Sequence, residues 1–263
     1  MPGVIDLHSH ILPGLDDGPA TMEGSLELAR AAVAAGTVTI LATPHVNGDY
    51  GLSPDRIDAA LVDVHTALAE AEISLEVLGG GEIAIWRLVD LDDATLGRLA
   101  LGAGPYLLVE SPFSPVVGDF EPMVLDLQAR GHRVLLAHPE RCPAFQRDRA
   151  RLDRLIDAGV LAQVTAGSMT GAFGSTVRRF TTGLLRDGLA HAVASDAHDH
   201  IQRPPGLTGG FAVLEPELPG LDAQREWMTE LLPSAILSGE PPPERPPLPR
   251  EAGGLRRRLR FRA

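Results

Sequence analysis

Short apolar runs alternate along the chain with longer segments in which apolar residues recur at helical spacing. The runs are rich in Val, Ile and Leu, as expected for buried strands. This alternation is typical of α/β proteins with a parallel sheet. The predicted strands are Val4–Leu7, Val38–Ala42, Leu75–Leu78, Tyr106–Val109, Val134–Ala137, Leu161–Val164 and Ala192–Ala194. The predicted helices are Thr21–Ala35, Pro54–Ala71, Phe120–Arg130, Phe145–Ala158 and Ser175–Asp187.

Side chains that bind metals well follow six of these seven strands. They are His8, His45, Glu82, Glu110, His138 and Asp196. In a closed barrel the C-terminal ends of all strands surround one opening, so residues far apart in sequence meet there. An open doubly wound sheet would spread them along a line. The pattern therefore favours a seven-stranded, TIM-like α/β barrel.

The length and the composition bound the number of domains. A chain of 263 residues with 44% apolar residues suits one domain of barrel size. After Ser238 the sequence becomes rich in proline and then in arginine. We therefore predict a barrel over residues 1–238 and a solvated, disordered tail over residues 239–263. The alternative for the arginine-rich end is a docking arm for an acidic partner or an anionic membrane surface.

Charge and residue usage exclude several classes of protein. A net charge of -12 argues against a nucleic-acid binder. All 23 basic residues are arginine, so a Schiff-base lysine, a P-loop lysine and a carbamylated lysine between two metals are excluded. Cys142 is the single cysteine, and no arginine stands where a cysteine-based phosphatase loop needs one. Together with a start that lacks a basic, apolar leader, this predicts a cytoplasmic enzyme without a transmembrane segment, in which water is the nucleophile.

Two short motifs extend the set of candidate ligands. His10 follows His8 at alternate spacing, so both imidazoles can face the same opening, and Asp196 is followed in the same way by His198. Asp17 lies in a turn-rich loop after the first strand. The candidate metal ligands are His8, His10, Asp17, His45, Glu82, Glu110, His138, Asp196 and His198. Nine ligands exceed the needs of one ion, so we expect two or three divalent ions, and the mixed donors suit Mn, Fe or Zn.

Several sequence blocks together resemble the PHP (polymerase and histidinol phosphatase) superfamily. Within it, the chain is most similar to the bacterial tyrosine-protein phosphatases of capsule and exopolysaccharide synthesis. The resemblance implies a distorted (β/α)7 barrel that carries three metal ions, with manganese favoured. The blocks are DLHSHILPGLDDGP, ATPHVNGDY, GGGEI, LLVESP, LAHPERC, VTAGSMTGAFG and ASDAHDHIQRPPGL, between Asp6 and about Leu207.

The same resemblance implies roles for particular residues. The nine candidates match the family's metal ligands, and Arg141 and Arg203 match arginines that bind substrate phosphate. The expected reaction is hydrolysis of phosphotyrosine on a protein through attack of a metal-bound hydroxide, and the expected partner is the tail of a bacterial tyrosine kinase. The alternatives are a phosphatase for a small molecule such as histidinol phosphate, and a non-catalytic metal-binding regulator. A role for His200 stays open.

Overall fold

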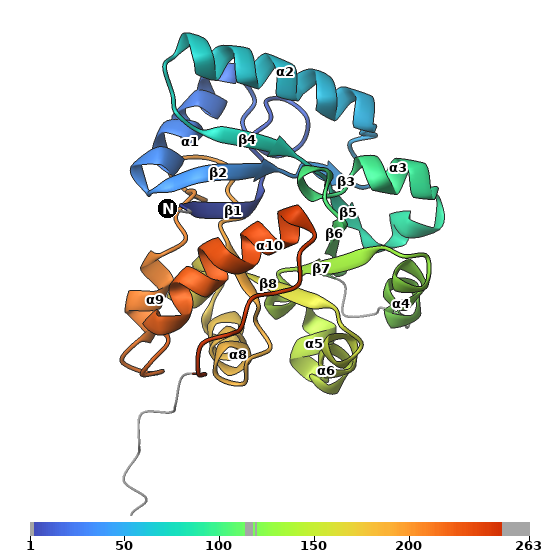
Figure 1. Cartoon of the computed structure of the whole chain (residues 1–263), viewed down its shortest axis with the longest axis vertical. Coiled ribbons are helices and arrows are strands. Elements are labelled where there is room, and N and C mark those ends of the chain that lie inside the picture. The colour runs from blue at the N-terminus through green and yellow to red at the C-terminus, as the bar shows by residue number, and fades with distance from the viewer. Residues whose placement is uncertain (1–2, 114–117, 119, 249–263) are drawn as a thin grey trace, which may run out of the picture.

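The computed structural model describes residues 3–113, 118 and 120–248 (Figure 1). Its strand segments are all parallel to their neighbours. They are β1 (Val4–Ser9), β2 (Thr37–Ala42), β3 (His45–Val46), β4 (Glu76–Gly79), β5 (Glu82–Ala84), β6 (Tyr106–Glu110), β7 (Arg133–Ala137), β8 (Leu161–Thr165) and β9 (Ala192–Ala194). Each of the seven predicted strands coincides with one of these segments, and only β3 and β5 were not anticipated.

The segments close into a barrel. One sheet has the order β1-β2-β4 and the other the order β3-β5-β6-β7-β8-β9. Segments β2 and β3 are two parts of one strand, and so are β4 and β5, so the first sheet passes into the second at these two breaks. A parallel bridge between Ser9 and Ala197 joins β1 to the residues after β9. The nine segments therefore make seven barrel strands, as the sequence predicted.

The two strand breaks occur at residues that interrupt a sheet for clear reasons. Pro44 has no N–H to donate to a ladder. At Gly81 an added Cβ would lie only 2.9 Å from the Val46 side chain, so glycine permits a close approach of the two chains. Beyond the breaks, His45 pairs in register with Glu82. The breaks thus place two candidate ligands side by side.

Contacts between the first and last strands form the barrel seam, which we define as the residues from Asp6 to His10 on one side and from Ser195 to His198 on the other. Asp6 accepts hydrogen bonds from the backbone N–H of Ser195 at 3.0 Å and from its hydroxyl. The N–H of Asp196 donates to the His8 carbonyl at 2.9 Å, and that of His10 to the Ala197 carbonyl at 2.8 Å. The seam therefore includes four candidate ligands, His8, His10, Asp196 and His198.

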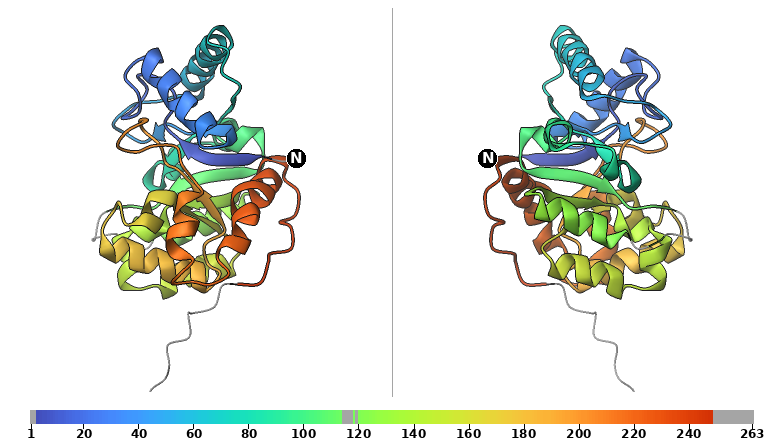
Figure 2. Two further views of the ribbon diagram at one scale, coloured as in Figure 1. Left: turned by 90° about the vertical axis from the view of Figure 1, so that its left-hand side faces the viewer. Right: turned by 90° about the vertical axis from the view of Figure 1, so that its right-hand side faces the viewer.

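Helices surround the barrel and cover the outer face of the strands (Figures 1 and 2). Because both faces are covered, β6 and β7 are almost entirely buried and apolar. The α-helices are α1 (Met22–Ala34), α2 (Pro54–Glu70), α3 (Asp93–Arg98), α4 (Glu121–Ala129), α5 (Pro143–Arg147), α6 (Ala150–Asp157), α7 (Ala166–Thr170), α8 (Ser175–Arg186), α9 (Gly209–Leu214) and α10 (Leu232–Ser238). Shorter helical turns are η1 (Ile85–Val89), η2 (Leu101–Ala103), η3 (Pro139–Arg141), η4 (Asp222–Gln224) and the π-helical η5 (Trp227–Leu231).

Four of the five predicted helices are confirmed as α1, α2, α4 and α8. Thr21 caps α1 by accepting a hydrogen bond from the N–H of Gly24 at 3.3 Å. The prediction of one continuous helix over 145–158 was wrong. Asp148 leaves helical geometry (φ -136°, ψ 88°) and its carboxylate accepts a hydrogen bond from the N–H of Ala150, so the segment divides into α5 and α6.

Residues 240–248 form an extended segment that we name the C-terminal strap. The Arg245 guanidinium donates to the carbonyls of Gly188 and Ala190 at 2.7 and 2.8 Å and lies 4.7 Å from the centre of the Trp227 ring. The Trp227 indole donates to the Pro243 carbonyl at 3.1 Å. The prediction of a disordered tail from Gly239 is therefore wrong for these residues, because their backbone carbonyls and Arg245 find partners on the barrel. Residues 249–263 of the predicted tail lie outside the described residues.

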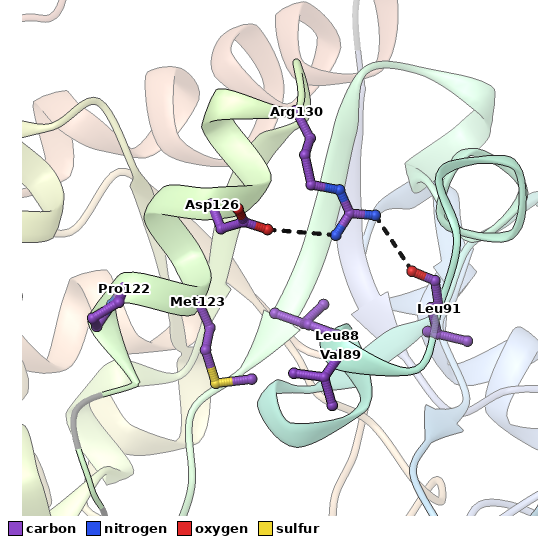
Figure 3. A pocket seen from close by; sticks show the side chains of 7 residues that line it. All are labelled: Leu88, Val89, Leu91, Pro122, Met123, Asp126 and Arg130. Carbon is purple, nitrogen blue, oxygen red and sulfur yellow. Dashed lines mark hydrogen bonds and ion pairs between the residues drawn. The ribbon is translucent and has the colours of Figure 1, made fainter.

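The C-terminal strap lies at the N-terminal ends of the barrel strands, since Gly188 and Ala190 precede β9. Figure 2 shows it on the same side of the molecule as the start of β1. On the outer wall, η1 and α4 enclose a groove of about 430 Å³, with Leu88, Val89 and Met123 along it (Figure 3). None of its lining residues is a candidate ligand. Within the residues that the structure describes, no helix has both the length and the apolar character needed to cross a membrane.

Candidate metal centre and its arginine pair

The structure brings all nine predicted ligands together at the C-terminal ends of the barrel strands. Glu82 is fully buried and lies at the middle of the group. Its Oε2 is 3.4 Å from His8 Nε2 and 3.5 Å from His10 Nε2. The same carboxylate reaches His45 Nδ1 at 2.8 Å through Oε2 and His138 Nε2 at 2.8 Å through Oε1. One carboxylate therefore contacts four imidazoles that come from three barrel strands, since His8 and His10 both belong to the end of β1.

Three subsets of the cluster place their donor atoms within 4.8 Å of one another, close enough to share an ion. They are His8 with His10 and Glu82; His45 with Glu82 and Glu110; and His10 with Asp17, His45 and His198. Glu82 belongs to two subsets, so its carboxylate would be shared between them if ions were bound. The third subset is the most accessible, because the side chains of Asp17 and His45 are 48% and 17% exposed.

Nδ1 of His138 is buried and makes neither a hydrogen bond nor an ion pair within the described residues. Three further buried donor atoms, Nδ1 of His45, Oε2 of Glu82 and Nε2 of His198, lack a hydrogen bond of good geometry and have only ion-pair contacts with other members of the cluster. Buried polar atoms are normally paired, because an unpaired one costs about 1–3 kcal/mol. Bound cations would satisfy such atoms. The mixture of imidazole nitrogen and carboxylate oxygen fits Mn, Fe or Zn.

Hydrogen bonds around the cluster orient its histidines. Asp16 Oδ2 lies 2.7 Å from His10 Nδ1, and Gln163 Oε1 lies 3.1 Å from His8 Nδ1. These partners favour the tautomer that carries its proton on Nδ1 and leaves Nε2 free to bind a cation. Neither Asp16 nor Gln163 was among the residues predicted from the sequence. The pair Asp16-Asp17 was visible in the sequence, but only the structure shows that one member contacts the metal cluster and the other supports a histidine.

Two residues of the cluster have backbone conformations that are uncommon for side chains with a Cβ. His138 has φ 31° and Asp196 has φ 54°. Residues held in the left-handed region cost on the order of 1–3 kcal/mol when the surroundings enforce them, and they concentrate at functional sites. His138 follows β7 directly and Asp196 follows β9 after Ser195, so both lie at the C-terminal ends of barrel strands. The strained backbone at His138 and Asp196 is therefore typical of residues in a functional site.

Burial and neighbouring charges shift the pKa values of the cluster in opposite directions. Burial disfavours a charged imidazole, but the carboxylates of Asp16 and Asp196 overcome this and raise the pKa of His10 to about 10. Burial raises the pKa of Glu110 to about 7, and repulsion from the Glu82 carboxylate adds to the rise. The carboxylates thus attract positive charge strongly and repel one another. A divalent cation would satisfy both tendencies.

The two predicted phosphate-binding arginines meet at Asp196. Arg141 Nη1 and Arg203 Nη2 each donate to Oδ2 of Asp196 at 2.5 Å. The other carboxylate oxygen, Oδ1, lies 3.5 Å from His8 Nε2 and 3.3 Å from His10 Nε2. Asp196 therefore stands between the candidate metal cluster and a pair of guanidinium groups.

Aromatic side chains border this arrangement. The Arg141 guanidinium carbon lies 4.9 Å from the centre of the Phe113 ring and 4.5 Å from that of Phe173. Tyr50 stacks on His45 with ring centres 6.1 Å apart. Cation–π contacts restrict the guanidinium plane of Arg141. His200 faces Glu27 at 3.4 Å and belongs to none of the three subsets, so the structure gives it no place in the cluster as described.

Comparison with known proteins agrees with this geometry. Residues 4–228 match the family described as capsular polysaccharide synthesis, CpsB/CapC. The chain belongs to the CpsB/CapC family. One relative is the tyrosine-protein phosphatase YwqE of Bacillus subtilis, with 39% identity over 81% of this chain and 85% of YwqE. Another is the putative tyrosine-protein phosphatase CapC of Staphylococcus aureus, with 30% identity over 76% of this chain and 79% of CapC.

Solved structures support the family and the fold. The chain superposes with a TM-score of 0.82 and 35% identity on a crystal structure from the pair YwqE of Bacillus subtilis and CpsB of Streptococcus pneumoniae, described as unique metal-dependent tyrosine phosphatases. The match covers 94% of this chain and 99% of the other. Dihydropyrimidinase from Brevibacillus agri shares the barrel fold alone, with a TM-score of 0.51 and 14% identity over 89% of this chain and 70% of that enzyme. The expectation of a distorted (β/α)7 barrel is confirmed.

Proposed function

We propose that this CpsB/CapC protein is a metal-dependent phosphatase that hydrolyses phosphotyrosine on proteins. The observation that carries the proposal is the position of Asp196, with His8 and His10 at one carboxylate oxygen and Arg141 and Arg203 at the other. A phosphoryl group beside Asp196 can contact cations and guanidinium groups together. The relatives that act as tyrosine-protein phosphatases support the same conclusion.

The nine clustered residues are the proposed ligands of two or three divalent ions, with manganese favoured. Four of the nine are carboxylates: Asp17, Glu82, Glu110 and Asp196. Such an acidic, partly buried set binds divalent cations better than monovalent ones. When bound, these ions lower the pKa of a coordinated water and neutralise charge on phosphoryl oxygens. Glu82 holds the group together, because its two oxygens reach both sides of the cluster.

Arg141 and Arg203 are the proposed substrate-binding groups. A guanidinium forms paired hydrogen bonds with phosphoryl oxygens and keeps its charge at every physiological pH. The aromatic rings of Phe113 and Phe173 keep the Arg141 guanidinium in place from within 5 Å. Without substrate, Asp196 keeps both arginines at the edge of the cluster. A phosphoryl group carries more negative charge than this single carboxylate and can replace it as their partner. These residues bind and orient the ester for attack by water.

The proposed partner is a tyrosine kinase that carries phosphotyrosine in an accessible segment. Support comes from the description of the family, which assigns it to capsular polysaccharide synthesis, and from the relatives that are named tyrosine-protein phosphatases. The exposed third subset of the cluster, at Asp17 and His45, suits a substrate presented on a protein surface.

The experiment that tests this function is a steady-state comparison of substrates. The protein is freed of metal, loaded with Mn²⁺, and assayed on a phosphotyrosine peptide and on histidinol phosphate. We expect a kcat/KM that favours the peptide and that disappears with chelator. Preference for histidinol phosphate would identify a small-molecule phosphatase instead. No turnover of either ester with Mn²⁺ present would identify a non-catalytic metal-binding regulator.

A further inference from the structure

A pocket of about 420 Å³ adjoins the arginine pair and has no role in the proposed metal cluster. Arg203 lines it at one end, next to Ser195. The rest of its lining is largely apolar, with Thr165, Thr170 and Gln202 as further polar residues, and comes from the end of β8 and the segment after it, from the loop before α9 and from α9 itself. Those residues include Ala166, Gly167, Ala172, Phe173, Ile201 and Gly209. The volume lies in the range of pockets that hold small organic groups.

The wall that carries Phe173 is held in place by specific packing. An added Cβ on Gly167 would lie 3.1 Å from the Phe173 ring, so glycine lets the ring settle against the α7 backbone. Gly171 and Gly174 both have φ 90°, a conformation that favours glycine, and they form the turns on either side of Phe173. This is the VTAGSMTGAFG block of the sequence, to which metal binding assigns no role.

Buried Glu140 connects this wall to the arginine. Glu140 Oε1 accepts hydrogen bonds from Thr165 N at 2.9 Å and from Ser168 Oγ at 2.6 Å, at the start of α7. Glu140 is the neighbour of Arg141 in η3. The segment that carries Arg141 and the segment that carries Phe173 are therefore fixed relative to each other. The pocket keeps its position beside the phosphate-binding groups.

We propose that this pocket binds the phenyl ring of the phosphotyrosine substrate, with Phe173 as its aromatic wall. The inference rests on the proposed phosphatase function. The charge distribution supports it, because a dianionic phosphate matches the Arg203 end and an apolar ring matches the remainder. Arg203 Nε is buried and makes no hydrogen bond within the described residues, so the arginine retains a free donor atom. Ring-to-ring contact with Phe173 favours an aromatic ester over an alkyl one.

Phe113 provides a matched control for Phe173. Both rings lie within 5 Å of the Arg141 guanidinium, but only Phe173 lines the pocket. An effect on binding that arises only through Arg141 should appear in both Phe113→Ala and Phe173→Ala. An effect that arises through the pocket should appear only in Phe173→Ala.

Two glycines provide a second, independent comparison. Gly209 lines the pocket, and an added Cβ there has no atom within 4 Å, so a Gly209→Leu side chain has space to enter. Gly97 in α3 is equally open but lines no part of the pocket. Gly97→Leu therefore controls for the general effect of replacing a helical glycine.

The test measures competitive inhibition constants of phenylphosphonate and methylphosphonate with the Mn²⁺-loaded protein. These compounds cannot be hydrolysed and share the phosphonate group, so the ratio of their constants reports the ring alone. We expect the wild type to bind phenylphosphonate at least about tenfold more tightly, since burying a ring is favourable. Phe173→Ala and Gly209→Leu should reduce that ratio several-fold, while Phe113→Ala and Gly97→Leu leave it unchanged.

Two results would overturn the assignment. If the wild type binds both phosphonates but the ratio is the same in Phe173→Ala and Gly209→Leu as in the controls, the pocket does not bind the ring and the proposed phosphatase function stands. If the wild type binds neither phosphonate and hydrolyses no phosphoester, the proposed function fails and the pocket assignment fails with it.

Discussion

Asp16 Oδ2 lies 2.7 Å from His10 Nδ1 and also accepts a hydrogen bond from the His45 backbone N–H at 2.9 Å. One carboxylate thus orients the imidazole of His10, which directly follows β1, and the start of β3 at His45. Asp16 is the neighbour of Asp17, yet its carboxylate contacts Nδ1 of His10 and Asp16 belongs to none of the three subsets. The role of Asp16 is to position ligands.

Replacement of Asp16 should weaken metal binding without removing a ligand. Asp16→Asn keeps the size of the side chain but gives a poorer acceptor for His10, and loss of such partners typically lowers metal affinity about 10–100-fold. Calorimetric titration of the metal-free protein with Mn²⁺ measures the effect. Asp90→Asn, on the surface in η1's C-cap, is the control. An affinity equal to the wild type in Asp16→Asn would disprove the positioning role.

The two arginines at Asp196 should affect turnover but not metal content. Arg141→Ala and Arg203→Ala each remove a donor for phosphoryl oxygens, so we expect kcat/KM on a phosphotyrosine peptide to fall about tenfold or more. Metal analysis of each variant should match the wild type. Arg178→Ala, which breaks a surface ion pair with Glu217, serves as the control. Unchanged turnover in both variants would mean that these arginines carry only surface charge.

Removal of metal should lower the stability of the barrel. Ions that bind the folded chain and not the unfolded chain stabilise it by about 2.7 kcal/mol at a hundredfold excess over Kd. We therefore expect the melting temperature to drop after chelation and to recover with Mn²⁺. Glu82→Gln, which changes the carboxylate shared by two subsets, should show a much smaller response to Mn²⁺. Equal melting temperatures with and without metal would count against the proposed ligand set.

Arg245 should contribute to stability and not to catalysis. Its hydrogen bonds to the carbonyls of Gly188 and Ala190 and its contact with Trp227 lie at the strand ends opposite the metal cluster. Loss of hydrogen bonds from a charged group that is partly buried costs about 1.5–3 kcal/mol. We expect Arg245→Ala to unfold at lower urea concentration with an unchanged kcat. Arg225→Ala, an exposed arginine paired with Asp222, should change neither quantity.

His191 should make stability depend on pH between about 4 and 6.5. Burial, with a smaller contribution from Arg245, lowers the pKa of His191 from 6.5 to about 4. In that interval the unfolded chain binds a proton that the folded chain does not, so stability falls as the pH falls, by at most about 1.4 kcal/mol per pH unit. Urea unfolding of the metal-free protein at pH 7 and pH 5 measures the loss. His191→Asn should lose less stability than the wild type over this range, and an equal loss would refute the assignment.

The strands and the clustering of the candidate ligands could be predicted from the sequence because both signals are local. Runs such as Tyr106–Glu110 are apolar throughout and end in a carboxylate, and parallel strands deliver their C-terminal residues to one opening. The roles of Arg141 and Arg203 were predicted only from the resemblance to a known family. The breaks at Pro44 and Gly81 were not predicted, because they depend on how closely two strands approach.

The remaining differences arise from contacts between distant parts of the chain. Proline-rich composition indicates a solvated segment, but the C-terminal strap is held by Arg245, whose acceptors lie more than fifty residues earlier. Asp148 breaks a helix that periodicity alone would continue. Gln163 lies within a strand pattern, and only the closed barrel places its amide beside His8. Propensity and spacing do not contain this information.

The barrel seam has a consequence for the order in which the chain folds. Asp6 and Ser195 are separated by 189 positions, so their contact closes one of the longest loops the chain can form and carries a large entropic cost. Contacts of such range form late. If His8 and His10 on one side and Asp196 and His198 on the other share ions, the metal fastens the first strand to the last, as a disulfide fastens the ends of a small secreted domain. In a cell that is short of metal, the barrel would then open more often at the barrel seam, and proteases would cleave the chain there first.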